Sequence, residues 1–205
     1  MALTQNDKKF WPPVKAVYDY LTNTVIAPDA KVLEIGPGHS PFKRANVYVD
    51  FVDVSGIEVI KCDVAVEPLP FEDKSFDFIV CRHCIEDMYN PFPLLKEMSR
   101  VGKSGYVETP SLIAELGRGV DGGSPPFRGY HHHRFMTWMF GKELRLISKY
   151  PFIEYLRFEE AKIDELLKQE RYWNTYCLWE GEITFAHRQS PLDFDIPRDY
   201  AAILN

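Results

Sequence analysis

Acidic residues and glycines follow three short apolar runs in the first third of the chain, and their types suit the binding of a nucleoside. Gly36 and Gly38 follow residues 31–35; they let the backbone pass close to a ligand, and the N–H groups of such a turn can receive a carboxylate or phosphate. Asp50 ends the second run, where an ionised carboxylate can accept both hydrogen bonds of a ribose diol. Asp63, after the third run, can bind the amino group of an adenine. Together these residues predict a pocket for an adenosine-containing cofactor.

Each of these signals has a simpler interpretation when taken alone. A glycine pair after a strand is often only a tight turn, and a single aspartate at a strand end is often a helix cap; three successive occurrences favour a ligand pocket. Asp53 is a second candidate for the ribose contact. A nicotinamide dinucleotide site is disfavoured, because Pro41 stands where the G-x-G-x-x-G pattern requires its third glycine.

The elements that must position these residues are short and mostly apolar on both faces, which is typical of a parallel sheet covered on both sides. Strands are expected at residues 31–35, 46–49, 58–61, 76–80 and 105–107, with helices over 13–25 and before Gly102. Ligands of such sheets bind beyond the carboxyl ends of the strands. The predicted fold class is therefore α/β: a Rossmann-like three-layer sandwich, mostly parallel, with an antiparallel C-terminal edge.

The second half of the chain has a different pattern. Residues 111–133 are rich in glycine and proline, so we expect a long functional loop there. Beyond it the pattern predicts a short helix over 141–148, a strand over 152–158, a helix over 160–172 and a strand over 177–186, the two strands forming an antiparallel edge pair. We expect one domain over 1–205, with an N-terminal helical segment over 1–29 and a substrate-loop insertion over 111–150.

Four stretches carry a resemblance to a known family: "VLEIGPGHS", "YVD", "KCD" and "LPFEDKSFDFIVCRHCIEDMYNP". Over roughly residues 30–110 they resemble the class I S-adenosylmethionine-dependent methyltransferases, in particular those with a type 11-like methyltransferase domain. The resemblance implies S-adenosyl-L-methionine as the cofactor. It further implies cofactor contacts by Glu34, Gly36, Pro37 and Gly38 at the methionine end, Asp50 at the ribose, Asp63 and Val64 at the adenine, and Arg82 and His83 beside the sulfonium.

The segment "GYHHHRFMTW" is the candidate for acceptor chemistry. In an extended segment His131 and His133 share one face while His132 points away. Because histidine titrates near neutral pH, we predict His131 and His133 as catalytic residues that act as bases or contact the substrate. Two alternatives stay open: a metal bound by the histidines with Glu108 or Glu180, and a cluster without chemistry. No metal ligand is assigned, and Trp138, Trp173, Tyr176 and Trp179 are candidates for an aromatic wall.

Composition limits the function classes. The 205 residues carry a net charge of −6 with scattered basic residues, so nucleic acid is not an expected partner. No run approaches a membrane span, and the four cysteines form no disulfide framework, so we expect a cytoplasmic protein in which Cys81 and Cys84 are structural. The predicted function is methyl transfer to a small-molecule or glycan acceptor at O or N. The alternative is a non-catalytic or metal-binding protein of the same fold, and the oligomeric state stays open.

Overall fold

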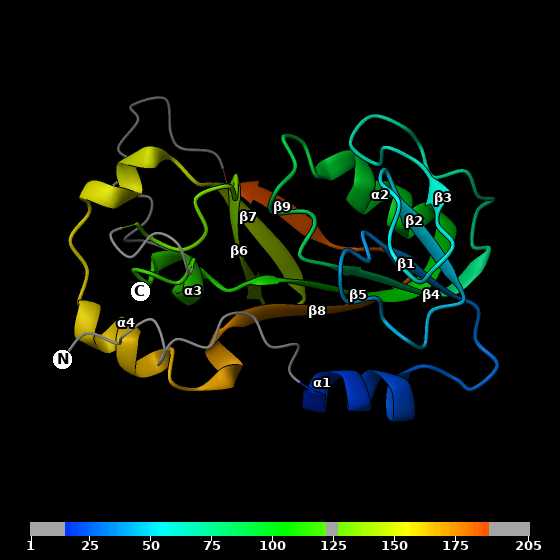
Figure 1. Ribbon diagram of the computed structural model, residues 1–205, viewed down its shortest axis with the longest axis horizontal. Helices are drawn as coiled ribbons and strands as arrows, with labels where there is room; N and C mark the ends of the chain where they lie inside the picture. The colour runs from blue at the N-terminus through cyan, green and yellow to red at the C-terminus, as the bar shows by residue number, and fades with distance from the viewer. Residues whose placement is uncertain (1–14, 122–126, 189–205) are drawn as a thin grey trace.

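The computed structural model describes residues 15–121 and 127–188 (Figure 1). Among these residues six strands form the main sheet in the order β3-β2-β1-β4-β5-β8. β8 pairs antiparallel with β5, and the other neighbours in this sheet are parallel. The strands are β1 (Val32–Ile35), β2 (Val47–Asp50), β3 (Ile60–Lys61), β4 (Phe76–Arg82), β5 (Gly102–Pro110) and β8 (Asn174–Glu180). The predicted fold class, including the antiparallel C-terminal edge, is confirmed.

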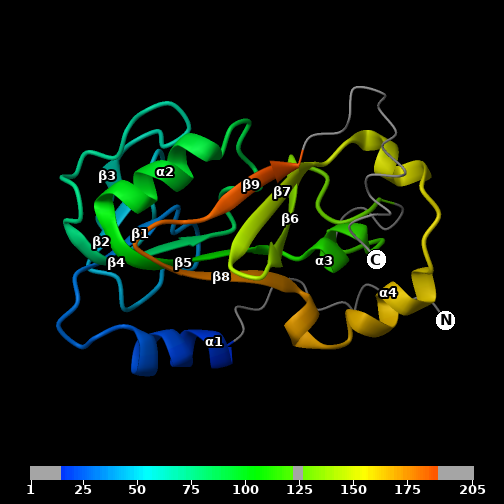
Figure 2. The same cartoon turned by 180° about the vertical axis from the view of Figure 1, so that it is seen from behind.

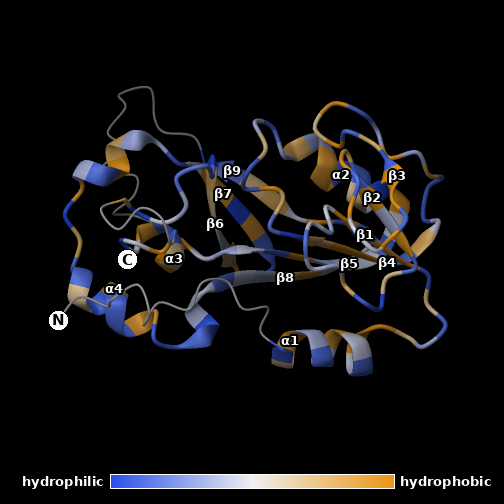
Figure 3. Ribbon diagram, in the orientation of Figure 1, coloured by the Kyte–Doolittle hydropathy of each residue, from blue (hydrophilic) through white to orange (hydrophobic). Residues whose placement is uncertain are grey.

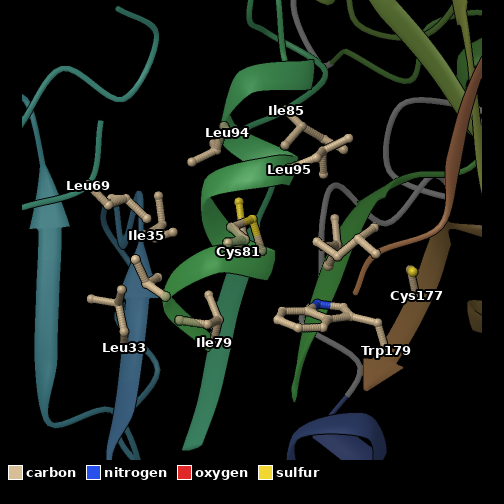
Figure 4. Packing of buried hydrophobic residues seen from close by; sticks show 14 of the residues in the cluster. Leu33, Ile35, Leu69, Ile79, Cys81, Ile85, Leu94, Leu95, Cys177 and Trp179 are labelled. Atoms are coloured by element: carbon tan, nitrogen blue, oxygen red, sulfur yellow. The ribbon is translucent and has the colours of Figure 1, made fainter. Parts of the chain in front are cut away.

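Alternate side chains of the central strands enter two separate apolar clusters, one on each face of the main sheet. Leu33, Ile35 and Ile79 pack with α2 (Phe92–Val101), whose Leu94 and Leu95 are buried. Figure 4 shows these side chains gathered between the helix and the strands. On the other face, Val32, Phe78, Val80 and Tyr106 pack against the segment that begins with α1 (Lys15–Tyr20) and a π-helical turn (Leu21–Val25). α1 and α2 lie on opposite sides of the sheet in both ribbon views (Figures 1 and 2).

A second sheet, of three strands in the order β6-β7-β9, lies beside the main one (Figure 2). It comprises β6 (Phe135–Phe140), β7 (Glu143–Ser148) and β9 (Phe185–Arg188). Together with α3 (Leu112–Leu116) and α4 (Glu160–Leu166) it surrounds a third apolar cluster that includes Met136, Ile147 and Trp173. α4 is largely polar, and in Figure 3 it is bluer than α2; of its residues only Ile163 is buried.

Three predicted elements after residue 140 are wrong. Residues 143–148 form a strand, because Leu144 and Leu146 alternate with partly exposed residues and Gly141, at φ 61°, makes the turn of a β6-β7 hairpin. The strand over 152–158 is replaced by a 3-10 helix, Pro151–Tyr155, whose proline cannot donate to a strand ladder. The strand over 177–186 is divided: β8 completes the main sheet, but β9 pairs with β7. The helix over 160–172 is α4 followed by a 3-10 turn, Glu170–Tyr172.

Within the two described ranges, none of the helices combines the length and the apolar character that crossing a bilayer requires.

Candidate functional site

A pocket of about 410 Å³ opens at the carboxyl ends of β1, β2, β3 and β4. The strand order reverses between β1 and β4, which is the place where open α/β sheets bind ligands. The volume of the pocket lies within the range of roughly 300–1,000 Å³ that is usual for small-molecule sites. Six residues of the predicted cofactor set line this pocket: Gly36, Gly38, Asp50, Asp63, Val64 and His83.

The turn after β1 requires glycine because of its backbone conformation. Gly36 and Gly38 have φ angles of 65° and 51°, a region that other residues rarely adopt. A Cβ on Gly36 would also lie 3.4 Å from the Sγ atom of Cys84, whereas a Cβ on Gly38 would meet nothing within 4 Å. The turn therefore exposes its backbone to the pocket, which suits the polar methionine end of the predicted cofactor.

Glu34 and Arg82 lie outside the pocket lining and contact each other. The Arg82 guanidinium donates to Oε1 of Glu34 at 2.5 and 3.1 Å, and the Phe42 N–H donates to Oε2 at 2.6 Å. Arg82 also donates to the Ser40 carbonyl at 2.5 Å and to the Tyr18 hydroxyl. Both side chains are at most 5% exposed, and burial raises the pKa of Glu34 although Arg82 opposes the shift. Through its hydrogen bonds to Ser40 and Phe42, this pair fixes the position of the glycine turn. Pro37 is buried and likewise does not line the pocket.

The two aspartates proposed for the ribose differ sharply in position. Asp50 ends β2, is 8% exposed, lines the pocket and accepts a hydrogen bond from the Val52 N–H at 3.2 Å. Asp53 lies outside the lining, and its side chain is 95% exposed and paired with Lys61. Asp63 follows β3 at the far side of the pocket and caps its own turn by accepting from the Ala65 N–H at 3.1 Å.

His83 lies at the end of β4 between two buried carboxylates. Its Nε2 atom lies 3.0 Å from Oε1 of Glu108, and its Nδ1 atom lies 3.4 Å from Oε1 of Glu86. Burial acts to lower the pKa of His83, but the contacts with Glu108 and Glu86 outweigh it and raise the pKa to about 9. The backbone of His83 has φ 49°, an uncommon conformation for a residue other than glycine. A charged imidazolium is thus held at the pocket wall by two buried acids.

The three consecutive histidines do not form an extended segment, which is the condition under which His131 and His133 would share a face. His132 and His133 both direct Nε2 toward Oδ1 of Asp87, at 3.7 Å each, while His131 binds Asp121 at 2.6 Å. The pairing of His131 with His133 on one face is therefore wrong. Glu108 is also not with the histidine cluster, because it contacts His83, Tyr106 and Asn174.

His133 is the one buried member of the three histidines, with 5% of its side chain exposed. Its Nδ1 atom lies 2.6 Å from Oε1 of Glu115, whose Oε2 accepts from Lys149 at 2.5 Å. Burial acts to lower the pKa of His133, but the hydrogen bond with Glu115 and the nearby charges of Glu86 and Asp87 raise it above the ordinary value.

Several lining residues have no place in the sequence-based prediction of the site: Val49, Phe51, Ala65, Cys84, Asp87, Met88 and Tyr89. Asp87 matters most, because it belongs both to the pocket wall and to the contacts of His132 and His133. Its only sequence signal is its position in "HCIEDMY", directly after the fourth strand. The exposed aromatic side chains at the pocket are Phe51 and Tyr89, at 71% and 84%. The aromatic wall predicted from Trp138, Trp173, Tyr176 and Trp179 does not line it; Trp173 and Trp179 are core residues.

Comparison with known proteins bears on the family of the chain. Residues 19–107 match the family described as methyltransferase domain. The match spans β1 to β4 and most of β5, and it confirms the resemblance to S-adenosylmethionine-dependent methyltransferases. Over residues 19–107 the chain is thus similar to the methyltransferase domain family, and S-adenosylmethionine is the cofactor that this likeness implies. No curated protein matches the chain.

Solved structures with some likeness to the chain include three bacterial proteins. YcgJ from Bacillus subtilis is 19% identical over 47% of this chain and 51% of its own, with a TM-score of 0.40. An S-adenosylmethionine-dependent methyltransferase from Aquifex aeolicus is 16% identical over 50% and 65%, with a TM-score of 0.38. Another from Thermotoga maritima is 25% identical over 45% and 49%, with a TM-score of 0.35. The chain thus spans only half to two thirds of these proteins, and with such scores nothing further follows from them.

Proposed function

We propose that the chain is an S-adenosylmethionine-dependent methyltransferase that acts on a small-molecule or glycan acceptor at oxygen or nitrogen. The observation that carries the proposal is the convergence of Gly36, Asp50 and Asp63, which lie at or just beyond the ends of three successive strands, on one pocket. Asp50 would bind the ribose, Asp63 and Val64 the adenine, and the Gly36–Gly38 turn the methionine end. When bound, the cofactor supplies a methyl group on a sulfonium, which is already an activated electrophile.

Glu34 and Arg82 enter this proposal as positioning residues. Arg82 binds the Ser40 carbonyl and Glu34 binds the Phe42 N–H, so the pair fixes both the turn and its distance from β4. His83 would border the sulfonium from the end of β4. Its positive charge is matched by Glu86 and Glu108, so the local sum of the three charges is negative and does not repel a cation.

The acceptor would bind where the pocket meets the histidine cluster. Asp87 lines the pocket, and its Oδ1 atom is 3.7 Å from Nε2 of His133. Glu115 accepts the Nδ1 proton of His133 and so directs Nε2 outward, which is the orientation that a proton acceptor needs. His131 is the weaker candidate for a base, because its side chain is 57% exposed and already bound to Asp121.

The cofactor part of the proposal can be tested with two neighbouring aspartates. Asp50→Ala removes hydrogen bonds to a charged group, worth about 1.5–3 kcal/mol, so affinity for S-adenosylhomocysteine should fall roughly 10- to 150-fold. Asp53→Ala is the matched control and should bind like the wild type, because its side chain points into solvent. Isothermal titration measures both. If the wild-type chain gives no heat at millimolar S-adenosylhomocysteine, the cofactor proposal is wrong. If only Asp53→Ala weakens binding of the ligand, the ribose contact belongs to Asp53 and not to Asp50.

The acceptor part can be tested by transfer of a labelled methyl group into pools of small molecules and glycans. Loss of a general base lowers turnover by about 10² to 10⁴, which is the expectation for His133→Gln. Affinity for S-adenosylhomocysteine should stay within about twofold in the same variant, which shows that the pocket is intact. His131→Ala should lower turnover less. Turnover of His133→Gln equal to that of the wild type would exclude the base role.

A further inference from the structure

Two histidines and one aspartate direct their donor atoms to a common point beside the cofactor pocket. Nε2 of His132 and Nε2 of His133 each lie 3.7 Å from Oδ1 of Asp87, and all three atoms lie within 4.8 Å of one another. Ligand atoms bound to one cation at about 2.0–2.2 Å are separated by roughly 3–3.5 Å. The two distances to Asp87 exceed this by a few tenths of an ångström, and the third separation is at most 4.8 Å. His132 and Asp87 have 56% and 44% exposed side chains, so rotation can close the gap.

His133 is held in the manner of a metal-bound histidine. Its Nδ1 atom is hydrogen-bonded to the buried carboxylate of Glu115, and that carboxylate is fixed in turn by Lys149. Histidines that bind metals nearly always have their second ring nitrogen held by a carboxylate, a carbonyl or water, which fixes the orientation of the coordinating nitrogen. The ring of Tyr130 stacks on His133 with centroids 4.6 Å apart and limits its rotation further. The nitrogen that faces Asp87 is therefore preorganised.

The charges around this point also favour a cation. Glu86, next to Asp87 in the chain, is 1% exposed, and in the described part of the chain neither oxygen of its carboxylate has a hydrogen-bond partner. Its charge acts on both Asp87 and His133. The His83 imidazolium lies 3.4 Å from Oε1 of Glu86 but is shared with Glu108, so one positive charge faces two buried acids. A bound cation would offset the remaining negative charge of this group together with that of Asp87.

We propose that Asp87, His132 and His133 form a binding site for a divalent transition-metal ion. Two imidazoles and one carboxylate suit Zn²⁺, Co²⁺, Fe²⁺ and Mn²⁺. Three protein ligands leave coordination positions open, as in catalytic rather than structural sites. Because Asp87 lines the pocket, an oxygen or nitrogen of a bound molecule can reach the ion from there. Nε2 of His133 cannot accept a proton while it binds a cation, so the base role proposed above belongs to the cation-free protein.

A second group of potential ligands, Asp121, His131 and His132, competes for the same histidine. None of its members is fully buried, and Nδ1 of His131 is already bound to Asp121 at 2.6 Å. Within the described residues, no buried carboxylate orients the rings of His131 and His132 in the way that Glu115 orients His133. The group with the buried, oriented histidine is therefore the one that we assign.

The test is titration of the chelator-treated, tag-free full chain with CoCl₂, followed by the visible absorption of protein-bound Co²⁺ and by isothermal titration. We expect one Co²⁺ per chain, at least about tenfold weaker binding in Asp87→Asn and in His132→Ala, and unchanged binding in His131→Ala. Asp87 and His132 are used because their exposed side chains can be replaced without disturbing the core. No absorption band or heat at millimolar Co²⁺ would overturn the site. So would weaker binding in His131→Ala with wild-type binding in Asp87→Asn, which would assign the ion to the competing group.

No cofactor is present in this titration, so its result does not depend on the proposed methyltransferase function. A chain that binds S-adenosylhomocysteine but not Co²⁺ would keep the function and lose the metal site. A chain that binds Co²⁺ but not S-adenosylhomocysteine would keep the metal site and lose the function.

Discussion

Two buried glutamates, Glu34 and Glu115, lie in different halves of the molecule and have opposite consequences for the site. Both are at most 1% exposed. The partners of Glu34 are Arg82 and the Phe42 N–H, which belong to the frame of the glycine turn. The partners of Glu115 are Lys149 and His133, and His133 still presents Nε2 toward Asp87. The first glutamate completes a scaffold, whereas the second supports a group that can do chemistry.

The largest expected effect comes from breaking the scaffold pair. Arg82→Met leaves Glu34 buried without its cation, and such a change costs about 3–5 kcal/mol of unfolding free energy. Urea unfolding measures the loss. In the matched double variant, Glu34→Gln with Arg82→Met, most of it should be regained because no buried charge remains. A single variant as stable as the wild type would mean that Glu34 is not held as a charged group.

The second largest change in unfolding free energy is expected from pH. It reports on a third buried group of charges, His83 between Glu86 and Glu108. The pKa of His83 is about 9 in the folded chain and 6.5 ordinarily. Because the pKa of His83 is higher in the folded chain than in the unfolded chain, its ion pairs stabilise the fold fully below about pH 6.5. This contribution to the unfolding free energy disappears as the pH rises through 9. The shift corresponds to something on the order of 3 kcal/mol. Unfolding free energies from pH 6 to 10 should fall for the wild type and fall less for His83→Gln; parallel curves would contradict the assignment.

Glu115→Gln tests the chemical side of the comparison. A lost hydrogen bond to a charged group costs about 1.5–3 kcal/mol, less than an isolated buried charge, because glutamine keeps one acceptor for Lys149. Turnover should fall as well, since Nδ1 of His133 loses the carboxylate that orients the ring. Affinity for S-adenosylhomocysteine should be unchanged. A variant that loses stability but keeps full turnover would make Glu115 a scaffold residue like Glu34.

The smallest effect is expected at the surface and sets the scale for the others. Lys103 and Asp77 form an ion pair at 2.7 Å with 60% and 42% exposed side chains. Exposed pairs contribute about 1 kcal/mol or less. Lys103→Met should therefore change the midpoint of urea unfolding only slightly. A loss as large as that of Arg82→Met would show that burial does not distinguish the two pairs.

The scaffold half of the molecule could be predicted from sequence because its signals are local. β1 is a short apolar run followed directly by Gly36, β2 is one that ends in Asp50, and the two-residue β3 comes just before Asp63, so the position of these three residues follows from the strand ends alone. The hairpin of β6 and β7 was missed because a six-residue apolar run is compatible with either a helix or a strand.

The histidine cluster could not be predicted because it depends on contacts between distant segments. The N–H groups of Arg134 and Phe135 donate to the Glu86 carbonyl, which brings the segment after β4 against the segment before β6. Only this pairing places Asp87 beside His132 and His133. Glu115 reaches His133 from α3, and no periodicity in the sequence relates these two residues.

A structure of the chain with S-adenosylhomocysteine bound tests the central claim most directly. We predict the ribose hydroxyls within hydrogen-bond distance of Asp50, the adenine beside Asp63 and Val64, and the sulfur facing the wall that holds His83 and Asp87. A ligand bound elsewhere, or in this pocket with its ribose away from Asp50, would contradict the account.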